Sequence, residues 1–407
     1  MVNQCDRPKT CYTNPNQPMK ITVNTKQFLK DLRLVSSIID KHSNPTIQDV
    51  KLVVSTMDAF LYATNAKQSI RLPLWCEVFE AGKVVLPLQD VLKILKITKE
   101  KSFHVYSGGK VHIDGVSGNE SYTLDMSNKT DDFPDVLPFK HKEYIQFIAR
   151  DLRIDLGRTL FAADNEKDAF RSACTGVNFE FPKRNAVDIV ATNGNRLAWQ
   201  QSKVTFVGTK PKQTVVPAKA LKLLEKVLVD VPDTVAVRMA IVEGKTRSVW
   251  FSVAGTTIIS TLPAEIQRYP DWRGLFKIEV ISPSIEISQE EVQRAIEILS
   301  PVAKAHKGGS LELHFDKALM VTTKALVGDK TMSITIKVKN VGDYKDRLQV
   351  DLGLFIDALK AIRDEPSVTM TVPCASWTDP NGKEHRNLSF LIETKDKYKH
   401  ILFAREV

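Results

Sequence analysis

One short pattern occurs three times in this 407-residue chain, about 130 residues apart, and it limits the possible folds more than any other feature. The copies are LYATNAKQSIRL from Leu61, IVATNGNRLAW from Ile189 and LMVTTKALVGDKTMSI from Leu319. A strand that leads into an amphipathic helix follows each of them, as KVVLPLQDVLKILK, QTVVPAKALKLLEKVL and RLQVDLGLFIDALKAIR. The chain therefore contains three copies of one structural unit.

Copies of this length are whole domains, because the units of solenoid proteins are only 20 to 50 residues long. The length of the chain allows them, at roughly 100 to 200 residues per domain. We expect domains at residues 19–140, 141–279 and 280–407. Residues 1–18, which are rich in Asn, Pro, Gln and Thr, are expected to form a flexible N-terminal tail.

Alternating apolar and polar residues predict the structure inside each copy. The stretches VKLVVSTMDAFLYAT, GVNFEFPKRNAVDIVAT and SLELHFDKALMVTT have the period of two that is typical of β-hairpins. Each copy also has two amphipathic helical segments. The expected fold class is therefore α+β, with two helices on one face of antiparallel sheet and about eight strands per domain.

Composition excludes several classes of protein. The hydrophobic fraction of 43% supports packed cores, but no run of 18 apolar residues predicts a membrane span and no secretion signal is evident. The five cysteines are scattered and form no C-x-x-C, so we expect neither disulfides nor a metal site, and a cytoplasmic location. No cofactor is predicted.

Basic residues recur on one face of the expected helices. In the helix expected at 25–40, Phe28, Leu32, Val35 and Ile39 form an apolar stripe beside a basic one. The basic positions are Lys26, Lys30 and Arg33 in that helix, Lys93 and Lys96 in the next, Lys219, Lys222 and Lys226 in the second copy, and Lys360 and Arg363 in the third. Any one of these faces is explained by solvation of surface lysines. Matching basic faces in all three copies, together with a net charge of +9, favour binding of a polyanion. Such faces would contact its phosphates and would not recognise a particular sequence.

Catalysis is not predicted. The chain has no G-x-x-x-x-G-K-[ST], H-E-x-x-H or G-x-S-x-G motif, and its eight histidines are dispersed. The cluster Asp131, Asp132 and Asp135 could suggest a two-metal nuclease. The second copy has only Asp271 in the corresponding RYPD, so a turn is the better interpretation.

The segments VATNGNRLAW, VVPAKALKLLEKVL and TLPAEIQRYPDWR resemble the bacterial sliding clamp, the beta subunit of DNA polymerase III. The resemblance extends from about Met19 to Val407 and is sharpest between Asp188 and Arg273. It implies a head-to-tail homodimer whose six domains form a ring, with helices around the hole. It also implies a processivity factor that encircles duplex DNA, is opened by an ATP-driven clamp loader and tethers DNA polymerase III subunits and other proteins with clamp-binding motifs.

The resemblance further implies a hydrophobic pocket for partner peptides between the second and third domains. Its expected walls are Thr192, Gly194, Arg196, Leu197, Pro270, Leu275, Leu402, Phe403, Ala404 and Arg405. A plain hairpin turn is the alternative for ATNGNRL, because Asn-Gly favours tight turns. The chain departs from the family at Asn195, where a His is usual, at Gly274, where an Arg is usual, and in its C-terminal residues FAREV.

DNA contacts and the subunit seam are implied in the same way. Ser172 and Ala173 stand where the family has a pair of DNA-facing tyrosines, which leaves Arg171 and Lys167 as candidates there. Lys41 and Asn44 are candidates in the first domain. At the seam between two chains, Tyr122 and Leu124 of one chain would meet Ile298 and Leu299 of the other. Ordinary core packing is the alternative for all four residues.

Two functions follow from these interpretations. The first is a DNA sliding clamp. The second is a clamp-like paralogue that binds partner peptides without being loaded on DNA, in a decoy or resistance role, and the missing tyrosines and altered C-terminus are its support.

Overall fold

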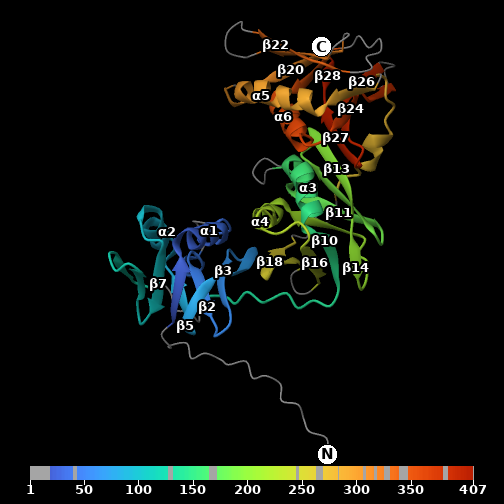
Figure 1. Cartoon of the computed structure of the whole chain (residues 1–407). Helices are drawn as coiled ribbons and strands as arrows, with labels where there is room; N and C mark the ends of the chain where they lie inside the picture. Colours follow the sequence, from blue (N-terminus) through green and yellow to red (C-terminus); the bar gives the residue numbers. More distant parts are fainter. Residues whose placement is uncertain are drawn as a thin grey trace, which may run out of the picture. The chain divides into compact units, whose positions relative to one another are not determined.

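The computed structural model in Figure 1 describes residues 19–39, 44–126, 132–164, 172–243, 247–262, 269–282, 284–305, 309–315, 319–324, 331–338, 347–378 and 384–406. Its internal contacts divide the chain into two compact units. The first unit comprises Met1–Tyr144, Lys226–Val231 and Val235–Thr261, and the second comprises Ile145–Glu225, Pro232–Thr234 and Leu262–Val407. Within the described ranges, no helix is both long enough and apolar enough to cross a membrane.

The described part of the first unit contains two α-helices, one short 3-10 helix and strands of two antiparallel sheets. Its helices are α1 (Thr25–Ser36), η1 (Pro45–Ile47) and α2 (Leu88–Ile97). Its strands are β1 (Lys20–Asn24), β2 (Val50–Val54), β3 (Ala59–Thr64), β4 (Gln68–Pro73), β5 (Cys76–Glu80), β6 (Gly82–Leu86), β7 (Ser102–Ser107), β8 (Val111–Gly115), β9 (Ser121–Leu124), β16 (Ala236–Val242), β17 (Ser248–Val253) and β18 (Thr256–Thr261). One sheet has the order β5-β1-β7-β8-β9, and the strands of the other that belong to this unit follow β16-β17-β18-β4-β3-β2-β6.

Helix α1 forms where the apolar period predicts it, but it is shorter than expected. Asn24 caps its N-terminus by accepting a hydrogen bond from the Gln27 amide at 3.1 Å. Phe28, Leu32 and Val35 are buried as predicted, whereas the helix ends at Ser36 and not near residue 40. The chain leaves the helical period there, so Ile38 is buried in place of the expected Ile39.

The second unit holds the rest of the second copy and all of the third. Its helices are α3 (Ala149–Thr159), η3 (Leu160–Ala162), η4 (Ser172–Thr175), most of α4 (Ala218–Leu228), η6 (Arg273–Lys277), α5 (Gln289–Ala305) and α6 (Leu352–Ala361). The strands are β10 (Tyr144–Ile148), β11 (Gly176–Lys183), β12 (Ala186–Thr192), β13 (Arg196–Lys203), β14 (Thr205–Val207), β15 (Gln213–Pro217), β19 (Ile285–Ser288), β20 (Ser310–Phe315), β21 (Leu319–Lys324), β22 (Thr331–Ile336), β23 (Arg347–Asp351), β24 (Ser367–Thr371), β25 (Cys374–Thr378), β26 (Glu384–Glu393), β27 (Tyr398–Phe403) and β28 (Arg405–Glu406). All of them except β10, β14 and β25 build the sheets β15-β11-β12-β13-β27-β26-β24-β19 and β22-β21-β20-β23-β28, and β25 pairs with β26.

Sheets continue across the boundaries between copies. In the first unit, β18 of the second copy pairs with β4 of the first, for example Ile258 with Ile70. In the second unit, β27 at the end of the third copy pairs with β13 of the second, for example Leu197 with Ile401. Figure 1 shows this pairing as a red strand beside a green one. The copies are therefore joined by main-chain hydrogen bonds as well as by the polypeptide.

The repeated sequence pattern is a repeated hairpin. In the first copy, Asn65 Oδ1 accepts hydrogen bonds from the amides of Lys67 and Gln68, at 3.1 and 2.7 Å. In the second, Asn193 Oδ1 accepts from the amides of Asn195 and Arg196, at 3.1 and 3.2 Å. The third copy also forms a hairpin, between β21 and β22, whose turn lies outside the described residues.

The predicted α+β class is confirmed. Each copy contributes two α-helices to the described part of the chain, and all the strand pairs in its sheets are antiparallel. The division into three domains stays a prediction, because compactness groups β16, β17 and β18 of the second copy with the first.

Candidate functional site

Strand β13, which carries the predicted Arg196 and Leu197, has two differently occupied faces. Successive side chains of a strand point to opposite sides of its sheet. Leu197 and Trp199 lie on one side with an apolar cluster, whereas Arg196 and Gln200 on the other bond to groups near α3 and α6. The predicted pocket residues are thus divided between two environments.

The apolar side is built mainly from aromatic rings, and we call it the aromatic face. Its members are the buried Val190, Leu197 and Trp272, with the partly buried Trp199, Tyr269, Leu275 and Phe276 packed against them. The ring centroids of Trp199, Trp272 and Phe276 lie 5.8 to 6.0 Å from one another. Rings at this spacing add to the stability that burial gives.

Charged groups border the aromatic face. The guanidinium of Arg273 lies 4.3 Å from the Trp272 ring centroid and forms ion pairs with Glu180 at 2.6 Å and Asp188 at 3.0 Å. Lys399 Nζ lies 5.7 Å from the centroid of Phe276. Four of the seven members are only partly buried, and accessible apolar groups with a charged border suit peptide recognition.

The structure brings together several of the predicted pocket residues. Leu197 and Leu275 belong to the aromatic face, and Pro270 follows Tyr269 in the half-buried segment beside it. The end of β27 lies beside the hairpin that joins β12 and β13. There the Phe403 amide donates a hydrogen bond to the Asn195 carbonyl at 3.1 Å. The Phe403 side chain is 38% exposed. Ala404 follows it and is half-buried.

Thr192 and Gly194 shape the hairpin. The Thr192 hydroxyl donates to the Arg196 carbonyl at 2.6 Å, and Gly194 has a φ of 87°, a conformation that favours glycine. The backbone of Arg405 pairs with Gln349 in β23, and its side chain lies outside the described residues. The alternative of a plain hairpin turn is thus correct for the turn itself, which lies at the end of the aromatic face.

Arg196 and Leu402 are placed differently from the expectation. Leu402 is 1% exposed and pairs with Arg196, so both side chains lie on the side opposite Leu197. Arg196 donates to Asp357 Oδ2 at 2.9 Å and to the Phe161 carbonyl. Burial lowers the pKa of the neighbouring His400 to about 3, and the Arg196 charge acts in the same direction. Strand alternation is the reason for this placement.

Sequence reasoning missed six residues of this region, two of which are Val190 and Tyr269. Ile401 pairs with Leu197 and shares its side of the sheet. Trp199, Trp272 and Phe276 form the rings of the aromatic face. Alternation from Leu197 would have identified Trp199, and alternation from Phe403 would have identified Ile401.

The predicted basic stripes are exposed. Lys26, Lys30 and Arg33 on α1, Lys93 and Lys96 on α2, and Lys219, Lys222 and Lys226 on α4 all present exposed side chains. Lys30 pairs with Asp230 at 2.5 Å and Lys93 with Asp90 at 2.9 Å, both in water-accessible positions. Exposed pairs of this kind are weak, so they leave the lysines available to phosphates.

The remaining DNA candidates are resolved only in part. Lys41, Arg171 and Lys167 lie outside the described residues. Asn44 caps η1 by accepting from the Thr46 amide at 3.1 Å. In η4, Ser172 is exposed and Ala173 is buried.

The predicted seam residues have mixed exposure. Tyr122 and Leu124 are half-buried on β9, which is the edge strand of its sheet in the described part of the chain. Ile298 on α5 is half-buried. Leu299 is fully buried beside Val292 and Ala295, so core packing accounts for it.

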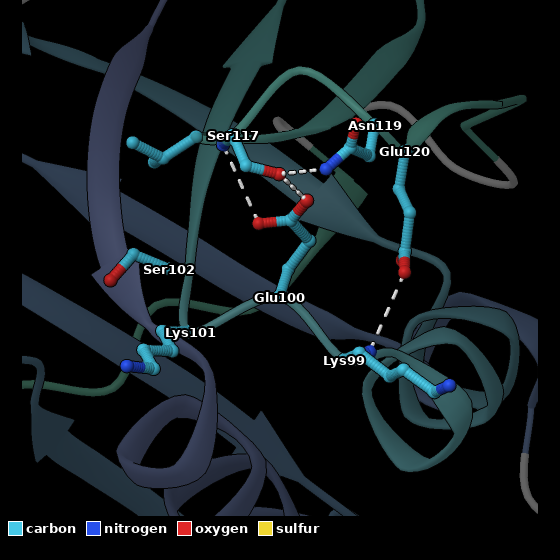
Figure 2. A pocket seen from close by; sticks show the side chains of 8 residues that line it. Lys99, Glu100, Lys101, Ser102, Ser117, Asn119 and Glu120 are labelled. Atoms are coloured by element: carbon cyan, nitrogen blue, oxygen red, sulfur yellow. Dashed lines mark hydrogen bonds between the residues drawn. The ribbon is translucent and has the colours of Figure 1, made fainter.

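A surface hollow of about 570 Å³ lies beside the residues that precede β9, and Figure 2 shows Glu100 and Glu120 among the side chains that line it. Glu100 accepts hydrogen bonds from the hydroxyl and amide of Ser117, while Glu120 accepts from the Thr98 hydroxyl at 2.6 Å and the Lys99 amide at 3.4 Å. The Thr98 hydrogen bond lowers the pKa of Glu120. Each carboxylate thus accepts hydrogen bonds from the loop that carries the other.

Nothing in the described ranges forms a cluster of His, Cys, Asp or Glu that could hold a metal ion. Asp135 pairs with the buried Lys51 at 2.8 Å, and Lys51 also donates to the Phe133 carbonyl at 3.3 Å. Asp131 lies outside the described residues. These contacts favour the interpretation of this segment as a turn over its interpretation as a metal-binding nuclease cluster.

Comparison with known proteins gives one consistent result. Residues 149–271 match the family of the central domain of the DNA polymerase III beta subunit. A beta sliding clamp of Staphylococcus aureus is 23% identical over an alignment of 358 residues that covers 85% of this chain and 91% of that protein.

Solved structures have the same fold. The DNA polymerase sliding clamp of Bacillus subtilis, 18% identical, superposes with a TM-score of 0.75 over 96% of this chain and 100% of its own. The sliding clamp of Pseudomonas aeruginosa bound to griselimycin, 19% identical, gives 0.74 over 96% and 100%.

Proposed function

We propose that this chain, a divergent member of the bacterial sliding-clamp family, is a non-enzymatic DNA sliding clamp that encircles duplex DNA and tethers a replicative polymerase. One observation carries the proposal. The three copies are joined by continuous sheets, and the helices of the first two present exposed basic faces. A ring lined by such helices would hold DNA by enclosure, with phosphate contacts that are weak and independent of sequence.

Retention on circular DNA tests this function. Protein loaded on a nicked circle by a cognate clamp loader should remain bound through moderate salt and run off within seconds after the circle is cut. Binding that survives cutting, or equal affinity for short linear duplex, would indicate a conventional basic groove. Failure to load at all, with partner peptides still bound, would favour the paralogue that binds peptides without DNA.

The lysines should control loading more than retention. Neutralising Lys26, Lys30, Lys219, Lys222 and Lys226 together should reduce loading and flatten its dependence on salt, because fewer counterions are then released. Retention on the circle should change little, since enclosure does not depend on charge. A matched control neutralises five exposed lysines outside the helices, namely Lys67, Lys140, Lys183, Lys203 and Lys212.

Partner binding belongs to the same proposal. The aromatic face, together with Ile401 and the exposed Phe403, would receive peptides from DNA polymerase III subunits, the clamp loader and other proteins with clamp-binding motifs. Apolar anchors with a charged border suit an extended peptide. We further propose a homodimer that acts in the cytoplasm, where its polymerase partners work.

A further inference from the structure

Arg196 has its side chain on the helix-facing side of β13, opposite the aromatic face. Its Nη1 donates to Asp357 Oδ2 on α6 at 2.9 Å, and its Nη2 donates to the Phe161 carbonyl in η3. The guanidinium also lies 4.9 Å from the centroid of the Phe161 ring. With 6% of its surface exposed, Arg196 connects a strand of the second copy to a helix of the third.

A second buried arginine makes the same connection. Arg158 on α3 pairs with Glu365, which follows α6, and their side chains are only 10% and 9% exposed. Arg158 Nη1 also donates to Gln200 Oε1 on β13 at 3.1 Å, and Gln200 Nε2 donates to the Asp396 carbonyl at 3.0 Å. We call Arg158, Arg196, Gln200, Asp357 and Glu365 the junction network.

Arg158, Glu365 and Arg196 are buried, whereas the Asp357 side chain is 41% exposed. Ion pairs of buried arginines specify geometry more than they add stability. Taking both charges out of water opposes their attraction, but removing one partner leaves the other charge buried and unpaired. The junction network therefore holds β13 in one position relative to α6. Members of the network line an open cleft of about 740 Å³ between α3 and α6.

The position of β13 matters for its other side. Leu197 directly follows Arg196 in the chain, pairs with Ile401 and belongs to the same apolar cluster as Trp199 and Trp272. A strand that shifts or tilts at Arg196 moves Leu197 with it, because consecutive residues share one planar peptide unit.

We infer that Arg196 is a positioning residue for the aromatic face, which it orders through Asp357 without touching the bound peptide. The inference rests on the proposed peptide-binding function. It predicts that Asp357, whose side chain lies on the far side of the sheet, controls peptide affinity to the same extent as Arg196.

A double-mutant cycle separates positioning from contact. Arg196→Gln and Asp357→Asn should each weaken binding of a clamp-binding peptide from a polymerase by about tenfold, or about 1.4 kcal/mol. The double variant should be no weaker than either single variant, since both changes break one interaction. Asp357→Glu, which keeps the charge, should restore most of the affinity. Asp364→Asn, at a side chain that is 86% exposed, is the matched control and should have no effect.

Hydrogen exchange without peptide provides an independent measurement. Amides of β13 and β27 should exchange faster in Arg196→Gln and Asp357→Asn, while those of the first unit remain unchanged. Weaker binding in Arg196→Gln alone, with normal affinity and exchange in Asp357→Asn, would overturn the inference and make Arg196 a contact residue. If the parent protein binds no peptide, the proposed function fails, and the exchange rates still decide whether Arg196 orders the strand.

Discussion

At the scale of single residues, the two best-described copies of the hairpin turn differ at one decisive position. Gly194 has a φ of 87°, and the equivalent Ala66 has a φ of 70°. A side chain in this left-handed region clashes with its own backbone and costs about 1–2 kcal/mol. An added Cβ at Gly194 would meet no atom beyond its chain neighbours within 4 Å, so the cost of an alanine there comes from the backbone conformation alone.

Exchanging these residues should move stability in opposite directions. Ala66→Gly should raise the free energy of unfolding by about 0.5–1 kcal/mol, because glycine adopts a positive φ without the clash. Gly194→Ala should lower it by a similar amount. Urea denaturation measures both, and a destabilised Ala66→Gly would contradict the argument.

Two buried carboxylates occupy equivalent places in the first helices of the first two copies. Asp31 in α1 and Asp155 in α3 each have one oxygen without a hydrogen-bond partner in the described structure. Desolvation raises the pKa of Asp31 to about 6 and that of Asp155 to about 7. The folded chain therefore binds these protons more tightly than the unfolded chain does.

This pKa shift predicts the direction of a pH effect. The stability contributed by protonated Asp155 is fully present below its ordinary pKa of 3.8 and is lost as the pH rises through about 7. Asp155→Asn should therefore raise the thermal midpoint at pH 8 by about 2–4 °C, the shift that ~1 kcal/mol produces in a unit of this size. The gain should shrink as the pH falls and be absent at pH 3.5, below the ordinary pKa. Asp364→Asn, at a side chain that is 86% exposed, is the control, and an equal gain at both pH values would refute the assignment.

At the scale of elements, sequence periodicity predicted which residues of a helix are buried and which are exposed. The buried Phe28, Leu32 and Val35 and the exposed lysines of α1 follow from a period of 3.6 residues. The end of the helix did not follow, because Ser36 and Ser37 end it through hydrogen bonds back to Arg33 and Leu34. The pairing of β13 with β27 was also beyond the sequence, since its partners lie about 200 residues apart and local preference does not choose between distant strands.

That pairing changes how the peptide site should be tested. Leu402 is buried, so deletion of the chain from this residue would remove core packing together with any peptide contact. Phe403→Ala is the cleaner change because its side chain is 38% exposed. We expect it to weaken binding of a polymerase peptide about tenfold, as loss of an aromatic anchor does, with little change in the thermal midpoint. Calorimetric titration measures the affinity. Phe79→Ala, at a 52% exposed position on β5, should leave it unchanged, and an unaltered affinity in Phe403→Ala would move the site elsewhere.

At the scale of the whole molecule, the repeat predicted the number of copies but not how they share sheets. The segments that begin at Leu61 and Ile189 have similar sequences, which indicates that they share a fold. Such similarity carries no information about which strand of one copy pairs with a strand of the next. The placement of β16, β17 and β18 in the first unit is a result of such pairing.

The dimer is a prediction at this scale. Sedimentation at micromolar concentration should give twice the chain mass of 45.7 kDa. Ile298→Ala together with Tyr122→Ala should yield monomers, because a few apolar anchors dominate such seams. Leu299 is left intact because its removal would damage the core. Met57→Ala, at a side chain that is 90% exposed, is the control, and a parent protein that sediments as a monomer would exclude the ring.

Continuous sheets between copies also have a mechanical consequence. Bending the chain where one copy meets the next would break ladders of four residue pairs between β18 and β4 and five between β13 and β27. The ladder between β13 and β27 would resist such strain further through the buried charges beside it. If two chains close into a ring, its compliant points are therefore the contacts between chains. A loader that pulls the ring open should part the subunits before it distorts either of them.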